Sequence, residues 1–124
     1  MPQILANKSD SYARSIFVSE NDVYVAGFMR DKGRYIATLW KNGTTQKLTD
    51  GYEDAKAHSV FVSNNDVYVA GIEGSDYYRS VAVLWKNGIP QNLTDGNHKA
   101  EAHSVFVSGD DVYVVGVGYE YVDE

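Results

Sequence analysis

The chain has 124 residues, with 17 acidic side chains against 11 lysines and arginines and a formal net charge of −6. This length suits one small domain, and the negative charge argues against binding to nucleic acid or to an anionic membrane, because both demand a cationic surface. The absence of cysteine excludes disulfides, thiolate metal sites and cysteine nucleophiles. The apolar runs fall far short of the roughly 18 residues of a membrane helix, and no secretory signal is visible at the N-terminus.

A 13-residue pattern occurs three times, at intervals of 44 and 45 residues, over residues 15–27, 59–71 and 104–116. In the middle copy, Val60 and Val62 alternate with Phe61 and two serines, as in a β-strand whose two faces differ. Asn-Asn-Asp at residues 64–66 tolerates the positive φ of a tight turn. Each copy is therefore predicted to form a β-hairpin.

A second hairpin is predicted after each of the first two copies. Residues 36–41 and 81–86 read as apolar strands, and each is followed by Asn-Gly, the strongest short-range hairpin signal. Residues 44–49 and 89–94 then form the return strands. We label the two strands of the first hairpin A and B, and those of the second hairpin C and D. Residues 2–6 resemble the D strand at residues 90–94, so the predicted strand order along the chain is D, ABCD, ABCD, AB.

Four short antiparallel strands that recur about every 40 to 45 residues are typical of a β-propeller blade. We therefore expect an all-β fold of propeller blades within one domain, residues 1–124. The expected segments are 1–13 (the D strand of a composite blade), 14–56 (blade 1), 57–101 (blade 2) and 102–124 (the A and B strands of a third, composite blade).

Two motifs carry a resemblance to a known family. The hairpins read VSxxDVYVAG at residues 18–27, 62–71 and 107–116, with Val115 in place of alanine, and WKNG stands at residues 40–43 and 85–88. With these motifs the chain resembles bacterial propeller-repeat proteins of cell-surface or secreted type over nearly its whole length. The resemblance implies a propeller fold and an extracellular or cell-surface location, and it implies no catalytic residue.

The candidate ligand-binding residues lie at one end of the predicted blades. Alternating strand directions place the tight A–B and C–D turns at one end, and the B–C loops (residues 28–35 and 72–80) and D–A linkers (50–56 and 95–101) at the other. The loops and linkers are long, charged and aromatic, and rigid scaffolds commonly carry function on such segments. The candidates are Arg34, Tyr35, Asp76, Tyr77, Tyr78, Arg79, His58 and His103.

Each candidate has a structural alternative. His58 and His103 share one repeat position, where a ring of histidines would bind an anion or a metal. Arg14 holds this position in the first copy, so capping of the strand start is favoured. Tyr77 and Tyr78 would stack on sugar rings, with packing between blades as the alternative.

Other recurring residues are assigned to structure. Trp40 and Trp85 stand at one blade position beside the Asn-Gly turns, which favours packing between blades. Asp22, Asp66 and Asp111 occur once per hairpin turn. Calcium would need six or more oxygen ligands from one neighbourhood, whereas a turn aspartate bonds its own backbone, so the turn role is favoured.

No nucleophile with a base, carboxylate pair or metal cluster stands out, so we expect no enzyme activity and no cofactor. The favoured function is a noncatalytic scaffold or interaction module, with a protein or a glycan as ligand. One alternative is a sugar-binding lectin with one shallow site per blade, and another is an engineered or amplified repeat fragment without a ligand.

The expected partner is a second copy of the chain. Propellers close with four to eight blades, and this chain carries fewer. A homodimer would form a six-bladed ring in which residues 2–6 and the third hairpin build a composite blade across the subunit boundary.

Overall fold

Ten antiparallel strands make up the fold of the computed structural model, which describes residues 10–74 and 79–119. No helix occurs in these two ranges, and hence none long and apolar enough to span a bilayer. The all-β prediction is confirmed. The strands are β1 (Ser11–Ser19), β2 (Asp22–Asp31), β3 (Arg34–Lys41), β4 (Thr44–Lys47), β5 (Ala55–Ser63), β6 (Asp66–Glu73), β7 (Val81–Lys86), β8 (Ile89–Asn92), β9 (Lys99–Ser108) and β10 (Asp111–Tyr119).

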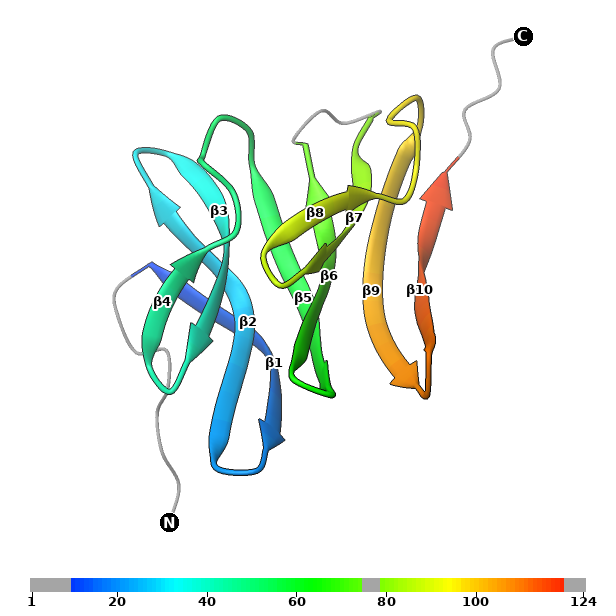
Figure 1. The fold of residues 1–124 in the computed structure, drawn as a ribbon. Coiled ribbons are helices and arrows are strands. Elements are labelled where there is room, and N and C mark those ends of the chain that lie inside the picture. Colours follow the sequence, from blue (N-terminus) through cyan, green and yellow to red (C-terminus); the bar gives the residue numbers. More distant parts are fainter. Residues whose placement is uncertain (1–9, 75–78, 120–124) are drawn as a thin grey trace, which may run out of the picture.

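The strands form three sheets that lie side by side (Figure 1). The first sheet has the order β1-β2-β3-β4, the second sheet has the order β5-β6-β7-β8, and a two-stranded sheet pairs β9 with β10. All three sheets are open. Strand β5 packs on the first sheet and β9 packs on the second, so the sheets form a stack in which the first strand of each sheet contacts the first strand of the next, in the order β1, β5 and β9.

The alternating sequence pattern buries both faces of the second sheet. Val60 and Val62 are 4% and 7% exposed and belong to the hydrophobic cluster shared with the first sheet. Tyr68 and Ala70 belong to a second cluster, shared with β9 and β10. Burial of apolar surface, worth about 25 cal/mol per Å², therefore holds this sheet from both sides.

The two Asn-Gly pairs form the tight hairpin turns that the sequence predicted. Asn42 and Gly43 have φ angles of 51° and 85°, and Asn87 and Gly88 have 52° and 84°. Positive φ at both central residues defines the type I′ turn. The exposed return strands are shorter than predicted, since they end at residues 47 and 92.

The predicted B–C loop over residues 28–35 is wrong. Strand β2 continues to Asp31 and β3 begins at Arg34, so only Lys32 and Gly33 form the turn. The charged residues that suggested a loop are the exposed tip of a long hairpin. Phe28 and Ile36 are both buried, on opposite faces of this hairpin.

The other predicted loop and the linkers are also partly strand. Strand β6 extends to Glu73, into the loop predicted over residues 72–80. Strands β5 and β9 begin at Ala55 and Lys99, inside the predicted linkers. Ala55 and Ala100 are buried, because the strands continue along the sheet interfaces beyond the repeated sequence motif.

A β-bulge recurs at the same repeat position in each sheet. The pairing register shifts at Arg14, His58 and His103, each an extra residue in its strand. The glycine that faces each bulge has no room for a Cβ, which would overlap a backbone carbonyl oxygen of the bulged strand. These glycines are Gly27, Gly71 and Gly116. A bulge re-aims the side chain that it carries.

Equivalent residues of the repeat join neighbouring sheets. Ser15 Oγ accepts a hydrogen bond from Val60 N, and Ser59 Oγ accepts one from Val105 N, both at 3.2 Å. Neighbouring ring centroids in a column of phenylalanines are 4.6 and 4.7 Å apart: Phe17, Phe61 and Phe106. The sheets are therefore stacked in the register of the sequence repeat.

We call the end of the stack that holds the β1–β2 and β3–β4 turns and their equivalents the turn end, and the opposite end the loop end. At the turn end, Asn42 Oδ1 accepts a hydrogen bond from Val23 N and Asn42 Nδ2 donates one to Asp22 Oδ1, both at 2.9 Å. Asn87 makes the same two bonds, to Val67 and Asp66. The aspartates thus bond a neighbouring turn, where the sequence predicted a bond to their own backbone.

Candidate functional site

A polar cavity of about 370 Å³ opens at the loop end, around the start of β5. It brings together residues from both four-stranded sheets and from β9. Its lining consists of Arg14, Tyr35, Asp54, Ala55, Lys56, His58, Ile72, Gly74, Ser80, Lys99 and Glu101. We call it the loop-end cavity.

An aromatic cluster of the first sheet lies beside this cavity. The rings of Tyr12 and Phe28 are stacked with centroids 4.8 Å apart, and Tyr35 meets Phe28 edge-on at 5.2 Å. These residues share a face because Tyr12 pairs with Phe28 across β1 and β2.

Two cations approach this cluster from neighbouring strands. Lys56 Nζ lies 4.9 Å from the centroid of Phe28 and 4.8 Å from that of Tyr35. The guanidinium carbon of Arg14 lies 5.2 Å from the centroid of Phe28. All three distances fall within the range of cation–π attraction.

His58 lies between the aromatic cluster and β9. Its ring stacks on that of His103 with centroids 5.5 Å apart, and its Nε2 lies 3.5 Å from Glu101 Oε1. Burial lowers the pKa of His58 below 6.5; Glu101 opposes this shift, while His103, Arg14 and Lys56 add to it. His58 is therefore mainly neutral at pH 7.

Backbone contacts fix the walls of the cavity. Asp54 Oδ1 accepts a hydrogen bond from Tyr35 N at 2.9 Å, and the Asp54 carbonyl accepts one from Gly74 N at 2.8 Å. On the far side, Ser80 Oγ donates to the Ala100 carbonyl at 2.8 Å and accepts from Ala100 N at 2.9 Å. The strand connections of the loop end are thus tied to both neighbouring sheets.

The predicted site residues separate into several groups. Tyr35 and His58 line the cavity, and His103 stacks beside it. Arg34 is exposed on β3 and does not belong to the lining. The remaining loop candidates, Asp76, Tyr77 and Tyr78, lie outside the described residues.

Arg79 lines a different cavity, of about 490 Å³, together with Glu53 and Glu73. Burial raises the pKa of Glu73, and the nearby negative charges of Glu53 and Asp50 add to this shift. The structure therefore brings Arg79 to an acidic neighbourhood, apart from Tyr35 and His58.

Sequence reasoning missed Arg14, Phe28, Lys56 and Glu101 as parts of one site. The available signal was the difference between repeats at equivalent positions. Phe28 corresponds to Ile72, Tyr35 to Ser80 and Lys56 to Glu101. These substitutions are scattered along the sequence, and the stacking of the sheets gathers them around one cavity.

Within residues 10–74 and 79–119, no three histidine or acidic side chains are grouped closely enough to hold a metal ion. Comparison with known proteins gave no matching family model, no similar curated protein and no similar solved structure.

Proposed function

We propose that the chain is a noncatalytic β-propeller scaffold, that its four-stranded sheets are blades, and that two copies assemble into a closed six-bladed ring with ligands bound at the loop end. The observation that carries this proposal is the repetition of one sheet-to-sheet interface, parts of whose two sides are exposed at the two outer faces of the stack. On the first sheet the exposed apolar part lies on β1, since Val25 and Trp40 on the same face are buried.

The first outer face belongs to the two-stranded sheet. Tyr113 is 56% exposed, whereas the equivalent Tyr24 and Tyr68 are 7% and 8% exposed. Phe106, the last ring of the phenylalanine column, is 57% exposed, and Val115 is 64% exposed. Apolar side chains that are buried between sheets elsewhere thus lie uncovered here, as at a protein interface.

The second outer face belongs to β1. Ile16 and Val18 are each 60% exposed, although their equivalents Val60 and Val62 are buried. Stacking β1 of one copy on β9 and β10 of another would repeat the contacts between the first and second sheets. Such a head-to-tail contact forms a ring when its rotation closes.

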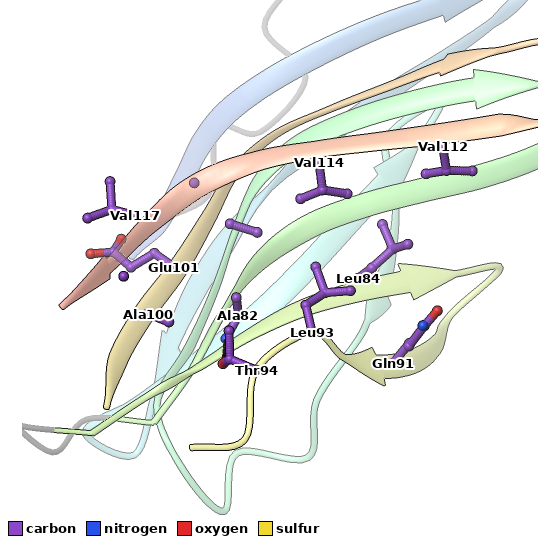
Figure 2. A pocket seen from close by; sticks show the side chains of 13 residues that line it. Ala82, Leu84, Gln91, Leu93, Thr94, Ala100, Glu101, Val112, Val114 and Val117 are labelled. Carbon is purple, nitrogen blue, oxygen red and sulfur yellow. Dashed lines mark hydrogen bonds between the residues drawn. The ribbon is translucent and has the colours of Figure 1, made fainter. Parts of the chain in front are cut away.

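An apolar groove of about 530 Å³ lies beside β10, where a further strand would fit (Figure 2). Leu84, Leu93 and Val114 lie around it. At the interface between the first and second sheets, Trp85 of β7 is 1% exposed and Leu48 is 9% exposed. Leu93, the equivalent of Leu48 in the second sheet, is 38% exposed at the groove. The groove is therefore the place where a composite blade would add a strand, although both tryptophans of the chain already lie in β3 and β7.

Pairing registers indicate how that strand would lie. Val25 pairs with Trp40, and Val69 pairs with Trp85, which makes Val114 the equivalent partner on β10. Within the described residues, β10 pairs with β9 alone. In the proposed ring, the neighbouring copy covers this edge. Residues 2–6, the predicted D strand, lie outside the described residues.

The assembly is tested by light scattering on the chain and on a variant of its outer face. The wild type should have twice the chain mass of 13.8 kDa. Val115→Lys should give a folded monomer, because a charge on this face prevents stacking without disturbing an isolated chain. Ile89→Lys is the matched control, since Ile89 is 72% exposed on β8, away from the outer faces. A monomeric wild type, or a dimeric Val115→Lys variant, would contradict the assembly.

The lectin alternative gains less support from the described residues. Stacking on a sugar needs an open aromatic face, and Lys56 lies over the ring of Tyr35. A glycan array compared between wild type and Tyr78→Ala would decide it, since a lectin should lose its signal in the variant.

A further inference from the structure

Arg14 and Lys56 stand out among the cations because both face aromatic rings at a cavity. Within the described residues neither forms an ion pair with a carboxylate. Both lie over the ring of Phe28, at 5.2 and 4.9 Å from its centroid. Two positive charges without such an ion pair are thus held at one ring, in a cavity that Asp54 and Glu101 also line.

His58 adds a third nitrogen to the same cavity. Its Nε2 atom is buried and makes no hydrogen bond to the described residues. The 3.5 Å separation from Glu101 Oε1 brings the two groups close without forming such a bond. A buried polar atom without a partner is uncommon and calls for an explanation.

We propose that the loop-end cavity binds a small anion through Arg14, Lys56 and His58, with a carboxylate or a phosphate group as the recognised chemistry. Hydrogen bonds between such cations and an anion are short and strong. The volume of about 370 Å³ suits a small molecule, and the ring of Tyr35 forms an apolar wall beside the charges.

The equivalent region of the second interface shows that stacking does not require this cluster. There, Ile72 replaces the phenylalanine and Ser80 replaces the tyrosine, and Ser80 bonds directly to both backbone groups of Ala100. Sheets of this repeat therefore pack with or without the aromatic and cationic set. A binding role accounts for its presence at one interface.

Anion binding should strengthen as the pH falls. The charged or titratable groups that face His58 are Glu101, His103, Arg14 and Lys56, and Tyr35, Asp54 and Lys99 also line the cavity. Protonation turns Nε2 into a donor for the anion, so a bound anion should raise the pKa of His58. Glu101 is the acidic group that competes with the anion for this proton.

The proposal deepens the binding role given to the loop end and does not depend on assembly, because all the residues belong to one chain. The test is calorimetric titration of the full chain with inorganic phosphate and with glucuronate, together with NMR titration of the His58 ring. We expect binding of at least one anion and a rise in the His58 pKa. Arg14→Gln and Lys56→Gln should each weaken binding about tenfold or more.

Lys86→Gln is the matched control, because Lys86 Nζ also lies over a tyrosine ring, 5.8 Å from the centroid of Tyr68, and belongs to the turn end. Binding of phosphate alone would identify a phosphate ligand, and binding of glucuronate alone a carboxylate ligand; either supports the proposal. No binding of either anion, or equal losses in Lys86→Gln and Lys56→Gln, would overturn it. The mass of the assembly is a separate measurement, so failure of one proposal leaves the other intact.

Discussion

The turn end and the loop end of the stack are built from the same repeats but differ in how faithfully they repeat. At the turn end, Asn42 and Asn87 make identical pairs of hydrogen bonds. At the loop end, Tyr35 of the first sheet forms part of an aromatic cluster, whereas its equivalent Ser80 bonds to Ala100. The contacts that are the same in both sheets hold the hairpins together, and the contacts that differ between the sheets shape a cavity.

This difference separates structural positions from candidate functional ones within a single chain. Three repeats of one chain act as internal controls for each other, because they share one backbone arrangement. A residue that is the same in every copy serves the shared arrangement. The cavity is lined mainly by residues that are not shared.

The largest effect is expected from the bulge of the second sheet. A Cβ on Gly71 would overlap the Lys56 carbonyl oxygen, so Gly71→Ala should lower the free energy of unfolding by about 3 kcal/mol. Gly118→Ala is the control, because its Cβ would meet open space. Urea denaturation measures both. Equal midpoints for the two variants would show that the bulge can relax.

A smaller loss is expected at the loop end of the second interface. Ser80→Ala removes both hydrogen bonds to the Ala100 backbone in a buried place, which should cost about 2 kcal/mol. Ser63→Ala, at a half-buried serine of β5, should cost less than half as much. A loss no greater than that of Ser63→Ala in urea denaturation would mean that water replaces the serine.

The turn end should respond equally in both sheets. Asn42→Ala and Asn87→Ala each remove the same two exposed hydrogen bonds, and each should lower stability by about 1 kcal/mol. Asn92→Ala, at an exposed position of β8, should leave the thermal midpoint unchanged. Clearly unequal losses of stability in the two variants would show that the two turns are not equivalent.

The smallest expected effect is a pH dependence at the loop end. The pKa of His58 is lowered in the folded chain, so the unfolded chain binds the proton more readily and stability falls as the pH drops below 6.5. His58→Gln should reduce this fall in the thermal midpoint. An identical pH profile for wild type and variant would exclude His58 as the titrating group.

Local sequence predicted the parts of the fold that local chemistry controls. The alternation around Val60 and Val62 and the Asn-Gly turns were sufficient for the hairpins, and they also placed the turns at one end. The length of the β2–β3 hairpin was missed because the exposed residues around Lys32 resemble a loop, although Phe28 and Ile36 on either side are buried.

The candidate site was predicted only in part for a different reason. Tyr35 and His58 were recognised from their residue types and repeat positions. Their neighbours Arg14 and Lys56 are ordinary surface residues in the sequence, and they join the site only because β1 and β5 lie side by side in the stack. A local sequence pattern cannot predict a contact between residues that belong to different repeats.

The ring proposal has a direct test in the contact that links adjacent sheets. Ser59 Oγ meets Val105 N between the second sheet and β9, and the equivalent contact between two copies would join residue 104 of one to residue 16 of the other. The chain has no cysteine, so the two introduced cysteines of the double variant Ser104→Cys and Ile16→Cys are its only thiols. They should form a disulfide between copies if the spacing at this contact resembles that between Ser59 and Val105. Under oxidising conditions, a closed ring of two copies predicts a single covalent dimer on a non-reducing gel, whereas uncrosslinked chains or a ladder of larger multiples would contradict it.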